Sequence, residues 1–320
     1  MLYHLSYLGF YFYSTIVFCI SSTDLLKISK EFVMRWIFFI QKLNQVLVER
    51  GLAIESQSML IAVSGGQDSA CLFQAIRILC PFWKWNLAIV SCDHAWFDLK
   101  SKSCSQISQL AWCSRIKYYQ SITPRRVIGE AKARSWRYES FARIGRAHNY
   151  SQIFTGHTAS DRAETLLYTI FRGSSQGGLS SLSWQRKLAF GVFLSRPMLI
   201  ITRSQSTMIC KKENFCITLD PSNQRYEWHR GRIRRRILPY LRRYFNPKAD
   251  QMLCQLAELA HAEACYLTAL CKNLEFKFCL QNFVCLPVSL QRRLLFFYFK
   301  REKIRQTFFS IEMARFSFLS

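Results

Sequence analysis

A short glycine-rich segment constrains the fold of this chain more than any other feature. The segment reads IAVSGGQDSACLF at residues 61–73 and follows an apolar run, residues 59–63, that has the length and composition of a buried strand. Apolar side chains at helical spacing then predict a helix over residues 70–79. A strand, a tight glycine turn and a helix leave backbone N–H groups unpaired at the start of the helix. Such groups bind an anion, and phosphate is the expected one.

Strands and helices alternate along the next hundred residues. Further strands are expected at 87–91, 117–122 and 152–155, and helices at 29–50, 101–114, 128–148 and 160–171. This order predicts an α/β fold with a doubly wound parallel sheet and helices on both of its faces. Alternation fades after residue 195, and residues 249–305 are predicted to be mainly helical.

Polar clusters follow three of the predicted strands. They are Ser64–Ser69, Asp93-His94 and Gly156-His157. Because ligands of open parallel sheets collect beyond the carboxyl ends of the strands, we expect these clusters to converge at one edge of the sheet.

Charge indicates a polyanionic partner. The 320 residues contain 44 Lys and Arg against 20 Asp and Glu, a formal net charge of +24. Such an excess favours nucleic acid as the partner. Residues 221–248 alone carry nine basic residues and one acid. We therefore predict an N-terminal extension and helix over residues 1–50, an α/β domain over 51–220 and a smaller, helical, basic domain over 221–320.

The cysteines and the N-terminus exclude some classes of protein. The 13 cysteines contain no Cys-x-x-Cys pair, which disfavours a zinc or iron–sulfur site, and they are interpreted as small buried residues. Residues 2–20 are apolar, but polar residues interrupt them and no basic cluster flanks them, so a membrane segment or a signal peptide is not favoured.

The glycine turn has the residues that a nucleotide site needs. Glycines let the backbone approach phosphate closely, serine hydroxyls donate to phosphate oxygens, and a carboxylate can bind Mg²⁺. No Lys follows the second glycine, so the turn is not a Walker motif. The predicted ATP-binding residues are Ser64, Gly65, Gly66, Gln67, Asp68 and Ser69, with Asp68 as the candidate Mg²⁺ ligand.

Two later segments concentrate further polar residues. Arg134 and Arg137 lie in a predicted basic helix. His157, Asp161 and Glu164 have the spacing of one helix face, next to the ligand edge of the sheet. A solvated face with salt bridges is the alternative interpretation of that spacing.

These motifs resemble a known family. The SGGxDS turn is similar to the pyrophosphate loop of the N-type ATP pyrophosphatases, the PP-loop superfamily, whose fold is Rossmann-like. The later motifs resemble the tRNA(Ile)-lysidine synthetase family. They are Ala133-Arg134-x-x-Arg137-Tyr138, His157-x-x-x-Asp161-x-x-Glu164-Thr165, Arg172-Gly173-Ser174, Gly178-Leu179, Arg196-Pro197-Met198-Leu199 with Thr202-Arg203, Asp220-Pro221-Ser222-Asn223, and Arg232-Ile233-Arg234. One departure is Ala95-Trp96-Phe97, which lacks an arginine often found shortly after the second strand.

The resemblance implies an activity. It predicts a ligase that uses ATP, with Mg²⁺, to join free L-lysine to C2 of the wobble cytidine in a tRNA(Ile) with a CAU anticodon. An adenylated cytidine is the intermediate, AMP and diphosphate are released, and the product lysidine changes the tRNA from methionine to isoleucine specificity.

The resemblance also suggests roles for individual residues. An acid holds the lysine ammonium or takes up its proton, but the sequence does not decide among Asp93, Glu130, Asp161 and Glu164. Phosphate or the extruded base is expected to contact arginines, and a histidine to contact phosphate or transfer a proton. These further candidates are His94, Arg134, Arg137, His157 and Arg172. The basic string that should follow the tRNA backbone is Arg230, Arg232, Arg234, Arg235 and Arg236.

Two other functions stay open at this stage. A tRNA thiolase would need catalytic cysteines near the loop, and Cys71, Cys92 and Cys113 are present. A catalytically inactive tRNA-binding protein is the second alternative. No protein partner is evident, and a membrane partner is not expected. The composition, which is rich in Phe, Ile, Tyr and Lys/Arg and poor in Gly, suits a plastid-encoded protein of the chloroplast stroma, with a bacterial cytoplasm as the alternative.

Overall fold

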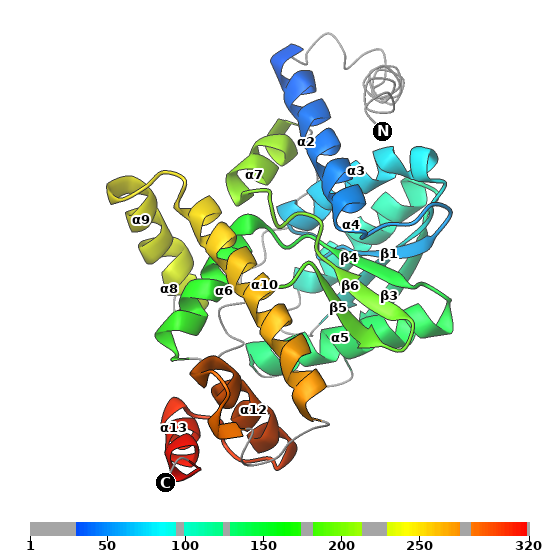
Figure 1. The fold of residues 1–320 in the computed structure, drawn as a ribbon. Helices are drawn as coiled ribbons and strands as arrows, with labels where there is room; N and C mark the ends of the chain where they lie inside the picture. The colour runs from blue at the N-terminus through cyan, green and yellow to red at the C-terminus, as the bar shows by residue number, and fades with distance from the viewer. Residues whose placement is uncertain are drawn as a thin grey trace. The chain divides into compact units, whose positions relative to one another are not determined.

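The computed structural model describes residues 30–93, 99–123, 129–173, 182–212, 229–275 and 283–318 (Figure 1). The chain divides into two compact units. Unit 1 comprises residues 1–159 and 184–225, and unit 2 comprises residues 160–183 and 226–320. The apolar stretch at 2–20, His94, the Ala95–Phe97 departure and the motifs at 178–179 and 220–223 lie outside the described residues.

A six-stranded sheet forms the centre of unit 1 (Figure 1). The strand order is β3-β2-β1-β4-β6-β5, and every neighbouring pair is parallel except β5 and β6. The predicted α/β fold with a doubly wound, mostly parallel sheet is therefore confirmed. The strands are β1 (Ser58–Ala62), β2 (Asn86–Asp93), β3 (Lys117–Ile122), β4 (Gln152–Thr155), β5 (Gln185–Ala189) and β6 (Val192–Ser195).

The strand order reverses at β1. From β1 the chain adds β2 and then β3 on one side, through α3 (Gln67–Trp83) and α4 (Leu99–Cys113). It then returns through α5 (Glu130–Ala147) to place β4 on the other side of β1. Because such crossovers are right-handed, α3 and α4 cover one face of the sheet and α5 covers the other. In sheets of this kind, ligands usually bind beyond the carboxyl ends of the strands where the order reverses, which here are the ends of β1 and β4.

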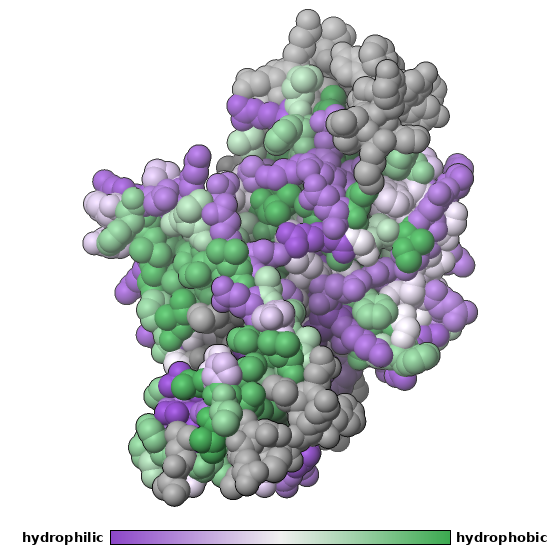
Figure 2. All heavy atoms as spheres, in the orientation of Figure 1, coloured by the Kyte–Doolittle hydropathy of each residue, from purple (hydrophilic) through white to green (hydrophobic). Residues whose placement is uncertain are grey.

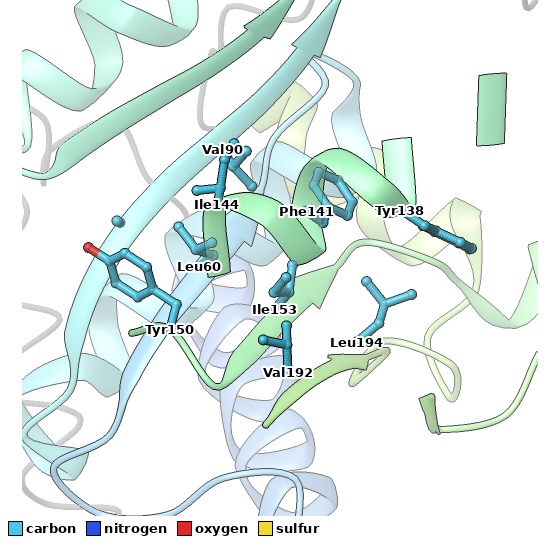
Figure 3. Close-up of a cluster of buried hydrophobic side chains, with 10 residues drawn as sticks. Leu60, Val90, Tyr138, Phe141, Ile144, Tyr150, Ile153, Val192 and Leu194 are labelled. Carbon is cyan, nitrogen blue, oxygen red and sulfur yellow. The ribbon is translucent and has the colours of Figure 1, made fainter. Parts of the chain in front are cut away.

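The core of unit 1 lies between α5 and the sheet. Figure 3 shows Phe141 and Ile144 of α5 directed towards Leu60, Ile153 and other apolar side chains of the strands. Leu60 and Ile153 are fully buried, because β1 and β4 are central strands with a helix layer on each face. This packing fixes the strand ends that carry the polar clusters.

Three elements of unit 1 were not predicted, whereas a fourth element was. β5 and β6 form an antiparallel hairpin at the edge of the sheet, and α7 (Arg203–Lys212) follows it. The predicted helix at 29–50 is present as α2 (Lys30–Glu49), which buries Ile40, Leu43 and Leu47.

Unit 2 is helical in its described part. Its helices are α6 (Ala159–Phe171, of which Ala159 belongs to unit 1), α8 (His229–Arg232), α9 (Leu238–Tyr244), α10 (Ala249–Glu275), α12 (Val288–Arg301) and α13 (Phe308–Ser317), with a π-helical segment, η2, at Ile233–Ile237. Ala163 and Leu167 of α6 pack against Ile233 and Leu238. A second cluster joins α12 to α13 around Phe283.

The surface of α10 remains partly apolar. Met252, Leu256, Leu259 and Tyr266 are exposed along it, and Figure 2 shows hydrophobic residues gathered over this part of unit 2. Among the described helices, none combines the length and the hydrophobicity that crossing a membrane requires.

Candidate active site

The phosphate loop, residues 64–69, joins the end of β1 to α3. Gly65 has a φ of 81°, which glycine adopts without strain. The Ser69 hydroxyl accepts from the Ser64 N–H at 3.1 Å and donates to the Gly66 carbonyl at 2.9 Å, which holds the turn closed. No side chain caps the N-terminus of α3 at Gly66, so the first N–H groups of the helix face the site without a side-chain acceptor at the cap. This is the geometry of an anion site at a helix of 17 residues.

Gly156 lies directly against this loop. A Cβ at Gly156 would lie 2.8 Å from the Asp68 carbonyl oxygen and 2.9 Å from the Ser69 nitrogen. Only glycine therefore fits where the end of β4 approaches the start of α3. The contact brings two of the predicted clusters together at the carboxyl ends of β1 and β4.

Asp93 belongs to the same edge of the sheet. It is the last residue of β2, which is the parallel neighbour of β1, and its side chain is partly exposed. Its carbonyl accepts from the Thr123 N–H at 3.1 Å. The ends of β1, β2 and β4 are thus adjacent, as the sequence predicted, whereas His94 lies outside the described residues.

The Asp68 carboxylate is held by α7. Arg203 Nε lies 3.2 Å from Asp68 Oδ2, and the Ser206 hydroxyl donates to Asp68 Oδ1. Next to them, Gln67 Nε2 donates to the Thr207 hydroxyl at 2.6 Å. Sequence reasoning placed Thr202-Arg203 in a family motif but assigned no role to either residue. In the sequence, Arg203 is only a basic residue in the 202–203 motif. Nothing in the local pattern predicts that it pairs with Asp68, which lies 135 residues away.

A magnesium ion fits this loop only in part. Mg²⁺ is commonly bound through one or two carboxylates together with substrate phosphates, so a single Asp68 beside a phosphate loop is compatible with it. Within the described residues, no group of three or more His, Cys, Asp or Glu side chains is arranged to hold a metal without a substrate. To bind Mg²⁺, Asp68 would have to give up its contact with Arg203 or share its carboxylate oxygens between Arg203 and the metal ion.

His157 does not share the helix face predicted for it. α6 begins at Ala159, so His157 lies in the connection between β4 and α6. Its Nδ1 is 2.9 Å from the Thr155 hydroxyl at the end of β4. The prediction that Asp161 and Glu164 share a helix face is correct, because both lie in α6. The prediction that His157 belongs to the same face is wrong, because the helix begins two residues after it.

Asp161 and Glu164 do share one face of α6, and in unit 2 they bind Arg234. Arg234 Nε and a terminal nitrogen lie 2.7 and 2.8 Å from the two Glu164 oxygens, and Asp161 Oδ1 is 3.5 Å away. The Glu164 side chain is 4% exposed and that of Arg234 is 34% exposed. The alternative interpretation, a solvated face with salt bridges, is therefore correct about the salt bridges and wrong about solvation at Glu164.

Arg172 and Arg230 both lie near the aromatic ring of Tyr168. Arg172 donates to the Tyr168 hydroxyl at 2.9 Å, and its guanidinium is 5.3 Å from the ring centroid. Arg230 lies 5.4 Å from the same centroid. The remaining members of the basic string differ in exposure: Arg232 and Arg236 are exposed, whereas Arg235 is half-buried. Arg234, Arg235 and Arg236 all lie in the π-helical segment, a form often found at functional sites.

Arg134 and Arg137 lie on α5 beside a buried tyrosine. Arg134 Nε donates to the Tyr138 hydroxyl at 3.0 Å, and the buried Arg196 approaches it at 3.5 Å. Burial raises the pKa of Tyr138, but Arg134 and Arg196 lower it, and the pKa lies below the usual value. Arg137 is half-buried, and the side chain of Glu130, the first residue of α5, lies outside the described residues.

The geometry agrees with the comparisons to known proteins. Residues 38–241 match the PP-loop domain family. A tRNA(Ile)-lysidine synthase of Nostoc sp. is 40% identical over 242 residues, which cover 76% of this chain and 71% of that protein. A chloroplastic tRNA(Ile)-lysidine synthase of Zygnema circumcarinatum is 36% identical, over 78% of this chain and 67% of the relative. A Synechococcus relative of the same name is 38% identical, over 81% and 82%.

The fold and the phosphate loop thus define a PP-loop protein. Within that class, the chain belongs to the tRNA(Ile)-lysidine synthase family. Among solved structures, the U34-tRNA thiolase of Methanococcus maripaludis, with its 4Fe–4S cluster, matches with a TM-score of 0.59 at 14% identity, over 71% of this chain and 80% of that one. This likeness concerns the fold alone.

Proposed function

We propose that the protein is an ATP-dependent ligase that converts the wobble cytidine of a CAU-anticodon tRNA(Ile) to lysidine, with free L-lysine as the second substrate. The observation that carries the proposal is the loop at residues 64–69, in a chain whose relatives of 32–40% identity are named tRNA(Ile)-lysidine synthase. The PP-loop domain at residues 38–241 implies that the protein binds ATP.

The first chemical step is adenylation of the cytosine C2 oxygen. This oxygen attacks the α-phosphorus of ATP, a P–O bond forms, and the bond to diphosphate breaks. The departing polyanion needs donors placed in advance, which the loop amides and the start of α3 supply. Mg²⁺ bound with Asp68 would neutralise charge on the phosphates.

The second step joins lysine to the base. The ε-amine attacks C2 and a C–N bond forms, the bond between C2 and its oxygen breaks so that AMP leaves with that oxygen, and the nitrogen loses a proton. Asp93, Glu130, Asp161 and Glu164 remain the candidates for binding the ammonium or taking up that proton. The Arg234 pair with Glu164 favours Asp161 over Glu164 for this task, because both Glu164 oxygens already accept from a guanidinium.

The tRNA is bound by basic side chains in both units. Arg232 and Arg236 are exposed cations of the basic string, and they suit contacts to the sugar–phosphate backbone. Arg134, Arg137 and Arg172 are candidates for phosphate or for the extruded base, with His94 and His157 for phosphate or proton transfer. A wobble base is already unpaired in its loop, so its extrusion costs little.

The relatives also suggest a compartment. Several are named chloroplastic and others come from cyanobacteria. We infer the chloroplast stroma, with plastid encoding, and retain a bacterial cytoplasm as the alternative.

One experiment separates this function from the alternatives. Purified protein is incubated with ATP, Mg²⁺ and a CAU-anticodon tRNA(Ile) transcript, and AMP and diphosphate are measured with lysine or with a sulfur donor. Sustained release of AMP that requires both tRNA and lysine supports a lysidine synthase. Release that requires the sulfur donor would indicate a tRNA thiolase, and no release by a protein that binds the tRNA would indicate an inactive binding protein.

A further inference from the structure

A basic cleft lies between α5 and β5 in unit 1, and of its lining residues only Arg134 and Tyr138 belong to the sequence motifs. It has a volume of about 510 Å³. Four cations and one acid lie among its lining residues: Arg134, Arg146, Arg186, Lys187 and Glu139. Within the described residues, none of these four cations forms an ion pair with an acidic side chain.

Two cations of this cleft gather at a single tyrosine. The guanidiniums of Arg134 and Arg186 lie 5.4 and 5.3 Å from the ring centroid of Tyr138. Arg196 reaches the hydroxyl of the same residue. Like charges held this close repel one another, and a bound anion would relieve that repulsion. The cleft is therefore built for negative charge.

An exposed aromatic side chain lies at the tip of the hairpin that borders the cleft. Phe190 is 90% exposed and occupies the turn between β5 and β6, where Gly191 has a φ of 71°. Lys187 Nζ lies 5.5 Å from its ring centroid. In Figure 2, hydrophilic residues predominate over the face of unit 1 that carries β5, with smaller hydrophobic patches among them.

Protection of a sheet edge explains only part of this arrangement. Charged side chains on an edge strand prevent pairing with another chain, and β5 is an edge strand. Edge protection does not require a fully exposed aromatic ring, nor cations that continue from the strand onto α5. Cations beside an exposed ring are the arrangement that binds unpaired nucleic acid, through phosphate contacts and base stacking.

We propose that the hairpin surface, formed by Arg146, Arg186, Lys187 and Phe190, binds an unpaired segment of the RNA substrate. The arginines and the lysine contact backbone phosphates, and Phe190 stacks on one base. This inference rests on the proposed function, which supplies a tRNA as the substrate. It adds a second RNA-binding surface, on unit 1, to the basic string of unit 2.

The test compares two edges of the same sheet. The variants are Arg186→Gln with Lys187→Gln, and Phe190→Ala. The matched controls are Lys117→Gln on β3, the opposite edge strand, and Trp112→Ala, an aromatic that is 84% exposed on α4. Thermal melting checks that each protein is folded, and affinity for a CAU-anticodon tRNA(Ile) transcript is measured across a salt series.

The two variants should fail in different ways. Loss of two cations should weaken binding and lower the slope of log affinity against log salt by at most about 2. Loss of the ring should weaken binding about tenfold at every salt concentration and leave the slope unchanged. The controls should bind like the native protein. In lysidine formation, both hairpin variants should raise the KM for tRNA and leave kcat near the native value.

Several results would overturn the proposal. One is equal affinity of the native protein and both hairpin variants, and another is an equal loss in the Lys117 and Trp112 controls. A loss of ATP affinity in place of RNA affinity would identify the cleft as a nucleotide site. Because the primary measurement is RNA affinity, this test does not depend on whether the protein catalyses lysidine formation. Absence of lysine incorporation by the native protein would contradict the proposed function alone.

Discussion

Arg234 binds both carboxylate oxygens of Glu164, at 2.7 and 2.8 Å, and thereby joins the π-helical segment to α6 inside unit 2. The pair also explains why one arginine of the basic string is not equivalent to its neighbours. The charge of Arg234 is paired with the Glu164 carboxylate, which is almost fully buried.

The Arg234 pair should matter for stability. Arg234→Gln leaves the Glu164 charge buried without its bidentate partner, so the free energy of unfolding should fall by about 1–3 kcal/mol, less than for a fully buried pair because Arg234 is partly exposed. Arg236→Gln, at an exposed position of the same segment, should change it by less than about 0.5 kcal/mol. Chemical denaturation of both variants measures this difference. Equal stabilities would mean that the pair does not hold the segment.

The exposed members of the string should carry the RNA contacts. Replacing Arg232 and Arg236 together with Gln should weaken tRNA binding and lower its log–log salt slope by at most about 2. Selectivity for cytidine should change little, because backbone contacts position RNA and base contacts choose it. Affinity across a salt series gives the slopes. If the double variant keeps the native slope, these arginines form only a solvated helix face.

Gly156 should tolerate no side chain. The new Cβ of Gly156→Ala would meet backbone atoms of Asp68 and Ser69 at 2.8–2.9 Å, so the end of β4 or the phosphate loop must move. We expect a loss of about 1–3 kcal/mol in stability and weaker ATP binding. Gly66→Ala is the steric control for stability, since its nearest neighbour would be the Ser64 hydroxyl at 3.5 Å. Melting curves in which both variants match the native protein would contradict the close approach.

Asp68 should act in chemistry and not in RNA binding. Asp68→Asn keeps an acceptor for the Ser206 hydroxyl but removes the charge that faces Arg203. We expect lysidine formation to fall by about a hundredfold or more, as for the loss of a group that stabilises transition-state charge. Affinity for tRNA should remain within about twofold. A folded variant that loses tRNA affinity would show that Asp68 helps to bind the RNA.

Local patterns predicted the first four strands of the sheet well and the β5–β6 hairpin poorly. The β3 and β4 boundaries at 117–122 and 152–155 match the structure. β4 is a buried strand between clear breaks, whereas β3 is an edge strand that contains the strand-forming residues Tyr118, Tyr119 and Ile122. The β5 segment, Gln-Arg-Lys-Leu-Ala, is polar and exposed, so it lacks that signal. Its partner β6 supplies the pairing that defines it as a strand.

The site was predictable where it follows the chain and not where distant segments meet. Ser64–Ser69 form a contiguous turn, and strand order alone brings Asp93 and Gly156 to the same edge. The contact of Asp68 with Arg203 depends on where α7 packs, which no local pattern specifies. Likewise, the spacing of Asp161 and Glu164 showed that they share a helix face, but not that Arg234 lies against it.

The most direct test of the central claim is transfer of labelled lysine to RNA. The native protein is incubated with ATP, Mg²⁺, labelled L-lysine and a CAU-anticodon tRNA(Ile) transcript, with a GAU-anticodon transcript as the control, and the RNA is digested to nucleosides. The account predicts ATP-dependent label in a single modified cytidine of the CAU transcript and none in the control. A preparation that binds ATP and the CAU transcript, yet leaves no lysine in the RNA, would contradict it.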